Sequence, residues 1–279
     1  MLSAPFNTAY RLSLLVAFAA TIASAGGLFL PDLYQDNALV TAAFRGNDFV
    51  TLFVAVPLLA WGLFYARRGS KRAQVIWFGA LAYMLYNYVF YLYGAAFNLF
   101  FLLYMALVTL SIYALIAGLI RIDAEDIKLQ FSLRTPVRWA SGYALFIAVL
   151  LAALWIGQTV HFIISGEIPV PITQTSHPTG VVFATDLTLL VPAMALGAVW
   201  LWQRRPWGYV LCTMLMVKGT TYTLAMILMS VFADRAGIPG AWALAPLWAV
   251  LGVGCLITTG LLLGNMQVRD NFRSGESRN

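Results

Sequence analysis

The feature that most restricts the fold of this chain is a series of eight apolar segments, each long enough to cross a lipid bilayer. A helix needs about 20 mostly apolar residues to span a hydrocarbon core of roughly 30 Å. Because unpaired backbone groups are costly in lipid, segments of this kind fold as helices. The sequence therefore predicts an all-α polytopic transmembrane helix bundle with eight helices at residues 11–30, 48–66, 74–95, 98–120, 139–164, 182–203, 207–232 and 242–266.

The composition agrees with this interpretation and excludes other classes of protein. Hydrophobic residues make up 61% of the chain, charged residues 10%, and the mean hydropathy is +0.81, far outside the range of soluble domains. The net charge of +6 does not indicate a nucleic-acid partner, because the basic residues lie in short gaps between apolar segments. Cys212 and Cys255 lie inside apolar segments and predict neither a disulfide nor a metal cluster.

The basic residues also predict the orientation in the membrane. With the N-terminus in the cytoplasm, all 17 lysines and arginines lie on the cytoplasmic side except Arg45 and Arg235, which lie outside, and Lys218, which lies within the bilayer. Both termini are then cytoplasmic, and residues 267–279 form a cytoplasmic tail. The prolines in the outer loops near 31–47 and 165–181 indicate ordered turns or short surface helices.

We expect residues 1–279 to form a single integral membrane domain, and two segments of the chain need an interpretation for this. Residues 11–27 resemble a secretion signal with small residues near the end, but only one arginine precedes the apolar stretch, so we interpret them as a retained first helix. The segment from Arg121 to Arg138 carries charges of both signs, and we expect it to be a linker on the membrane surface.

Two segments with the same order of features suggest an internal repeat. The segments from Asp48 and from Asp186 each begin with an aspartate, continue through an apolar run with a proline, and end in Arg-Arg. Each is the second helix of a four-helix half, so a parallel 4+4 repeat of halves 1–120 and 139–266 is expected, with helices 2, 3, 6 and 7 facing one another. A second explanation stays open, because helices that end in cytoplasmic arginines are common in membrane proteins.

Lys218, in "CTMLMVKGTTYTLAM", restricts the function more than any other residue. A lysine near the bilayer centre costs about 2.5–3.5 kcal/mol and normally faces the bundle or a cavity. We expect Asp186 on the preceding helix to be its partner, with Asp48 as the second candidate. Two interpretations remain open: a buried ion pair that fixes helix packing, and a proton-linked or anion-binding site.

The segment "MLYNYVFYLYGAAFN" places several polar aromatic residues within the third helix. Helical spacing puts Tyr83, Asn87 and Tyr91 on one face, and these side chains need hydrogen-bond partners in lipid. If this helix faces the seventh, Asn87 reaches Lys218 or Tyr222. The stripe predicts either packing with satisfied hydroxyls or an aromatic-walled pocket for a lipid-like or planar ligand. The next face carries Tyr86, Phe90, Tyr93 and Phe97.

Other motifs add little chemistry. His161 and His177 are the only histidines, and the chain has no metal-site spacing, catalytic nucleophile motif or phosphate-binding loop, so no cofactor is assigned. Lys218 has the chemistry to form an imine with a retinal-type chromophore. Two features count against a retinal protein: Met214 stands four residues earlier in place of an aspartate, and there are eight helices in place of seven. "GLLLG" near the C-terminus suits helix packing within the chain or in a homo-oligomer through helix 8.

The segments "FATDLTLLVPAMALG", from Phe183, and "RRPWGYVLCTMLMVKGTT", from Arg204, resemble uncharacterised bacterial multi-pass integral membrane proteins. The resemblance covers mainly helices 6 and 7. It implies a place in the bacterial cytoplasmic (inner) membrane and carries no activity.

These observations predict a multi-pass membrane protein that binds or translocates a small amphipathic or lipid-like molecule at an intramembrane polar site among helices 2, 3, 6 and 7. Two alternatives remain: a non-transporting membrane subunit or scaffold, and an intramembrane enzyme or chromophore protein that uses Lys218. Membrane lipid is the expected surrounding partner. The expected ligand-binding residues are Lys218, Asp186, Asp48, Asn87, Tyr83, Tyr91 and Tyr222.

Overall fold

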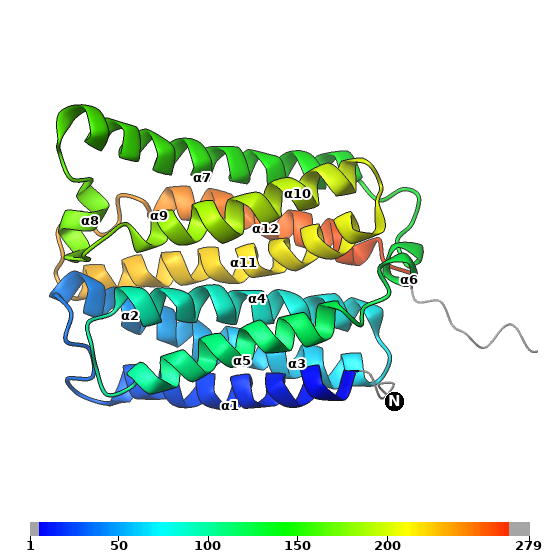
Figure 1. Ribbon diagram of the computed structural model, residues 1–279, viewed down its shortest axis with the longest axis horizontal. Helices are drawn as coiled ribbons and strands as arrows, with labels where there is room; N and C mark the ends of the chain where they lie inside the picture. Colours follow the sequence, from blue (N-terminus) through cyan, green and yellow to red (C-terminus); the bar gives the residue numbers. More distant parts are fainter. Residues whose placement is uncertain (1–5, 268–279) are drawn as a thin grey trace, which may run out of the picture.

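The computed structural model describes residues 6–267, and within them it forms a bundle of long helices that run side by side (Figure 1). Eight helices of this part of the chain are long and apolar enough to cross a membrane, which confirms the predicted number. The predicted tail, beyond residue 267, lies outside the described residues. The eight spans are α1 (Asn7–Phe29), α2, η2 and α3 (Ala38–Arg67), α4 (Lys71–Gly94), α5 (Phe101–Leu119), α7 (Val137–Ser165), α9, η3 and α10 (Val181–Trp202), α11 (Pro206–Arg235) and α12 (Ala245–Gly264).

Two short helices lie in the loops at opposite ends of the bundle. α8 (Val170–Thr175) lies in the loop after α7, where the prolines predicted a short surface helix. α6 (Ala124–Leu129) lies in the predicted linker and is followed by an isolated antiparallel bridge between Phe131 and Met266. The linker is therefore attached to the end of α12.

The second span begins ten residues before its predicted start, and the predicted outer loop at 31–47 was wrong in this part. α2 (Ala38–Val50) begins after Asn37, whose side-chain oxygen accepts a hydrogen bond of 3.0 Å from the amide of Val40. Polar residues interrupt the hydropathy here, but Asn47 and Asp48 are only 2% and 1% exposed because they face the inside of the bundle. Asp48 consequently lies about 15 Å along the helix and not at its outer end.

Two of the spans contain a π-helical turn immediately before a proline. η2 (Thr51–Ala55) precedes α3 (Val56–Arg67), and η3 (Asp186–Leu190) precedes α10 (Val191–Trp202). Pro57 and Pro192 are the second residues of the helices that follow. A proline lacks an amide hydrogen and its ring crowds the carbonyl four residues earlier, so the preceding turn widens.

α4 and α11 form the centre of the bundle and pack against each other. α2 packs along α11, and α9 (Val181–Thr185) contacts α4 from the other side. The outer helices differ between the two halves, since α1 packs closely along α5 whereas α7 barely contacts α12. The second half is therefore more open between its outer helices.

One end of the bundle holds the first turn of α1, the end of α12 and arginine-rich turns. The guanidinium of Arg67 lies 5.2 Å from the ring centre of Tyr10 on α1. At the same end, Arg72 Nη2 donates a hydrogen bond of 2.5 Å to the carbonyl of Met266. Both ends of the described chain thus lie on one side of the bundle.

The crossing of α2 and α11 depends on Gly46. A Cβ atom there would lie 2.6 Å from the carbonyl oxygen of Leu228 and 2.7 Å from the Cα of Met229. We expect Gly46→Ala to lower the free energy of unfolding by about 1–3 kcal/mol, because the two backbones must separate. Thermal unfolding in detergent measures this loss.

Gly157 on α7 provides the matched control, since a Cβ atom there meets nothing within 4 Å. Alanine is favoured over glycine inside a helix by up to about 1 kcal/mol, so Gly157→Ala is expected to keep or slightly raise the unfolding midpoint. Equal midpoints for the two variants would contradict the close crossing.

Candidate functional site

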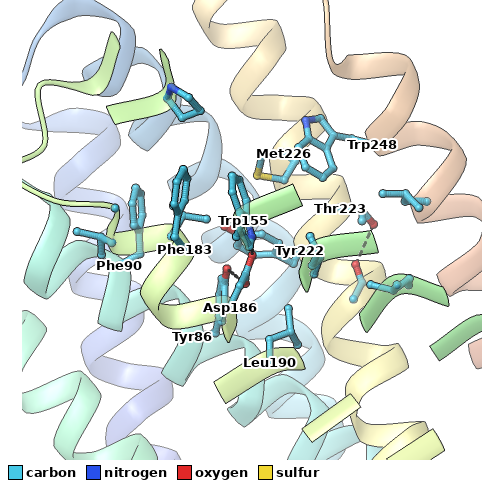
Figure 2. A pocket seen from close by; sticks show the side chains of 18 of the residues that line it. Tyr86, Phe90, Trp155, Phe183, Asp186, Leu190, Tyr222, Thr223, Met226 and Trp248 are labelled. Atoms are coloured by element: carbon cyan, nitrogen blue, oxygen red, sulfur yellow. Dashed lines mark hydrogen bonds between the residues drawn. The ribbon is translucent and has the colours of Figure 1, made fainter. Parts of the chain in front are cut away.

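A cavity of about 260 Å³ lies in the second half of the bundle (Figure 2). It is enclosed by residues of α4, α7, η3, α10, α11 and α12, and it reaches from Lys218 in the middle of the bundle to the loop around α8. No residue of the second span, Ala38–Arg67, lines it. The site was predicted among helices 2, 3, 6 and 7, but the cavity uses helices 5 and 8 in place of helix 2.

Lys218 is buried on α11, with 3% of its surface exposed. Its Nζ lies 3.5 Å from the ring centre of Tyr86 and 4.4 Å from that of Tyr222, so two electron-rich ring faces stabilise the charge. Among residues 6–267 it forms no ion pair, and its Nζ donates no hydrogen bond to another residue. The ion pairs in this part of the chain are Lys71–Asp126 and Lys128–Glu125.

Asp186 is held by two other side chains of the cavity. Its Oδ1 accepts a hydrogen bond of 2.6 Å from the hydroxyl of Tyr86, and its Oδ2 accepts one of 2.7 Å from Trp155 Nε1, as Figure 2 shows. The expected direct ion pair with Lys218 is therefore not formed. Tyr86 joins the two groups, because its ring contacts the ammonium and its hydroxyl holds the carboxylate.

Aromatic and aliphatic side chains form the walls. Trp155 and Phe183 stack with their ring centres 4.3 Å apart and an interplanar angle of 23°. Leu190, Met226 and Trp248 line other parts of the wall (Figure 2). The cavity thus combines one polar end, at Lys218 and Asp186, with a long apolar surface.

The loop around α8 covers the outer part of the cavity and is attached to the first half of the chain. Asn37 Nδ2 donates a hydrogen bond of 2.9 Å to the carbonyl of Gln174. His177 lines the cavity and meets the ring of Phe90 edge-on, with ring centres 5.5 Å apart. Burial lowers the pKa of His177, an effect that nearby Asp36 opposes, and burial raises the pKa of Asp36 itself.

Four of the seven expected site residues, Asp48, Asn87, Tyr83 and Tyr91, belong to a separate cluster in the first half. Asp48 accepts hydrogen bonds from the hydroxyls of Tyr34 and, at 3.0 Å, Tyr91. Asn47 Nδ2 donates to Asn87 Oδ1 at 2.5 Å and to the Tyr91 hydroxyl at 3.1 Å. This cluster is buried, and its acceptors and donors are largely satisfied within the chain.

The predicted polar face of the third helix exists, but its neighbour differs from the one expected. Tyr83 and Asn87 contact Asn47 of α2, which begins earlier than predicted, and Tyr83 also contacts Thr51 of η2. Asn87 therefore bonds to Asn47 and does not reach Lys218.

Lys218, Asp186 and Tyr222 are the expected residues that the structure brings together at the cavity. The sequence interpretation missed Tyr86 and Trp155, which hold Asp186. Tyr86 lies on the second aromatic face of its helix, next to the face that was chosen. Trp155 stands in an apolar helix, and its indole N–H, which needs an acceptor when buried, was the available signal.

Comparison of the chain with protein-family models, with curated proteins and with solved structures gives no match. Among residues 6–267, no group of three or more histidine, cysteine, aspartate or glutamate side chains is placed to hold a metal ion. The chemistry of the site is therefore argued from the side chains of the cavity.

Proposed function

We propose that this membrane protein binds or translocates a small amphipathic or lipid-like molecule, which occupies the cavity with its polar end at Lys218. The observation that carries the proposal is Lys218 itself, a buried cation that faces a mostly apolar cavity without an ion pair or a hydrogen bond to the described residues. A lysine that only fixes helix packing is normally paired directly, because an uncompensated buried charge is costly.

The shape of the cavity supports a ligand with a small polar end and an apolar body. Its volume of 260 Å³ corresponds to about nine water molecules at roughly 30 Å³ each. A small molecule, or one end of a longer chain that continues past the α8 loop, matches this volume. The stacked rings of Trp155 and Phe183 suit a flat or aliphatic body.

The scaffold alternative is better supported by the Asp48 cluster than by Lys218. The carboxylate of Asp48 and the side chains of Asn47 and Tyr91 bond to one another within the bundle. A network of this kind locks helices together. The contrast with Lys218, which lines a cavity and has no hydrogen-bond partner among the described residues, favours a binding role for the second half.

We also propose that the two halves are a parallel repeat. Thr51 and Asp186 begin the two π-helical turns, and 32 residues after each stand Tyr83 and Lys218. In the first half the hydroxyls of Thr51 and Tyr83 form a hydrogen bond of 2.8 Å. The equivalent positions in the second half are Asp186 and Lys218, which line the cavity. This suggests that the same helical arrangement carries an uncharged pair in the first half and a charged pair in the second.

The positive-inside distribution supports cytoplasmic termini, and the bacterial inner membrane is proposed from the resemblance of the segments at Phe183 and Arg204. We expect a membrane-impermeant thiol reagent to label Gln174→Cys from outside intact cells and to label Gly69→Cys only after the cells are opened. Cys212 and Cys255 are replaced by alanine in both variants, although both are buried. Labelling of both positions from the same side would contradict the topology and the parallel repeat.

The binding proposal is tested by native mass spectrometry with lipid and metabolite extraction. We expect a molecule to co-purify with the wild-type protein and to be lost from Lys218→Met, because its polar end loses the ammonium. Asp48→Asn, in the separate cluster, is the matched control and is expected to retain the molecule. A wild-type protein that carries nothing would support the scaffold alternative.

The same spectra give the oligomeric state. Gly260 and Gly264 on α12 meet no other atom within 4 Å of an added Cβ, so packing within the described chain does not explain them. A homo-oligomer through α12 stays a prediction, and a purely monomeric mass would contradict it.

A further inference from the structure

The charges at the cavity restrict the chemistry of the ligand. Among residues 6–267, Lys218 and Asp186 are the lysine and the acidic residue that line it, His177 lies at its loop end, and no arginine or glutamate lines it. A ligand with a carboxylate or phosphate would place two anions beside one cation in a buried, mostly apolar space, which is costly. A neutral ligand leaves the two side-chain charges balanced. The free N–H donors of Lys218 then require an acceptor such as a carbonyl oxygen.

We infer that the ligand is an aldehyde with an apolar body and that Lys218 forms an imine with it; this inference rests on the proposed binding function. Nζ lies over the rings of Tyr86 and Tyr222, which line the cavity together with Lys218, and it forms no ion pair with a carboxylate of residues 6–267. An unprotonated lysine amine beside a bound aldehyde acts as a nucleophile toward the carbonyl carbon.

The reaction balances with the groups at hand. The neutral amine of Lys218 adds to the carbonyl carbon, and one proton moves from nitrogen to oxygen to give a carbinolamine. The hydroxyl takes a second proton and leaves as water, while the nitrogen lone pair forms the C=N bond. One amine and one aldehyde thus give one imine and one water, without an oxidant or reductant.

The surrounding side chains suit the product as well as the free lysine. Protonation of the imine puts a positive charge on the same nitrogen, which the rings of Tyr86 and Tyr222 stabilise. Asp186 remains the counter-ion, held in place by Tyr86 and Trp155. The charge balance of the cavity is unchanged.

The chain is well suited to a test because it has only three lysines. Lys71 and Lys128 lie at the end of the bundle that holds the arginine-rich turns. They are partly exposed and form ion pairs with Asp126 and Glu125, respectively. The purified protein is placed in liposomes of phosphatidylcholine, a lipid without primary amines, and is incubated with trans-cinnamaldehyde and cyanoborohydride. The reductant converts an imine to a stable secondary amine, which peptide mass spectrometry assigns to a residue.

We expect labelling at Lys218 on the order of tenfold above that at Lys71 or Lys128, because the cavity holds the aldehyde beside Lys218, whereas Lys71 and Lys128 do not line it. Cinnamyl alcohol, which has the same body and cannot form an imine, is expected to protect Lys218. Lys218→Arg keeps the charge and is expected to remove this labelling. Leu151→Trp keeps the lysine and fills the cavity, so it is also expected to reduce the labelling of Lys218. This variant tests the inference if Lys218→Arg does not fold.

The outcomes separate the inference from the proposed function. If cinnamyl alcohol raises the thermal unfolding midpoint of the wild-type protein but not of Leu151→Trp, while Lys218 stays unlabelled, the imine is wrong and the binding site stands. If neither probe binds and Lys218 stays unlabelled, both fail for this class of molecule. Labelling that is equal at all three lysines, or unchanged in Leu151→Trp, also overturns the inference.

Discussion

The ammonium of Lys218 lies against the rings of Tyr86 and Tyr222 in the middle of an apolar bundle. A charge at that depth raises the free energy of the folded state unless something nearby stabilises it. Tyr86 supplies part of this stabilisation and also fixes Asp186, the opposite charge, through its hydroxyl. Lys218 and Asp186 are therefore both held by Tyr86 without a direct ion pair between them, and both line the cavity.

The two halves of the bundle use similar helices in different ways. In the first half, α1 packs along α5, and the polar groups around Asp48 bond to one another. In the second half, α7 contacts α12 much less than α1 contacts α5, and Lys218 and Asp186 line a cavity to which both α7 and α12 contribute. Both halves contain a π-helical turn before a proline, and this turn carries Thr51 in one and Asp186 in the other. The first half, with its bonded polar cluster, packs against the second half along α4 and α11.

Much of the fold could be predicted because lipid permits few structures. The length of the apolar segments and the positions of the turns predicted all eight spans. The start of the second span could not be predicted from hydropathy, since Asn47 looks like a loop residue until the partners of its side chain are known. The sequence also showed that Lys218 needed a partner. It did not show that Tyr86 would stand between Lys218 and Asp186. Helical spacing defines two adjacent aromatic faces on this helix, but only the packing of the other helices decides which face meets Lys218.

The measurement that tests this account most directly is the unfolding free energy of Lys218→Met after ligand and lipid have been exchanged for detergent. If Lys218 serves a ligand, its removal takes away a buried charge that has no direct ionic partner, while Asp186 keeps its hydrogen bonds from Tyr86 and Trp155, so the stability stays within about 1 kcal/mol of wild type or rises. If Lys218 locks the helices through an ion pair, its loss leaves Asp186 buried and uncompensated. A fall of about 3–5 kcal/mol, the cost of breaking a buried pair, would contradict the account.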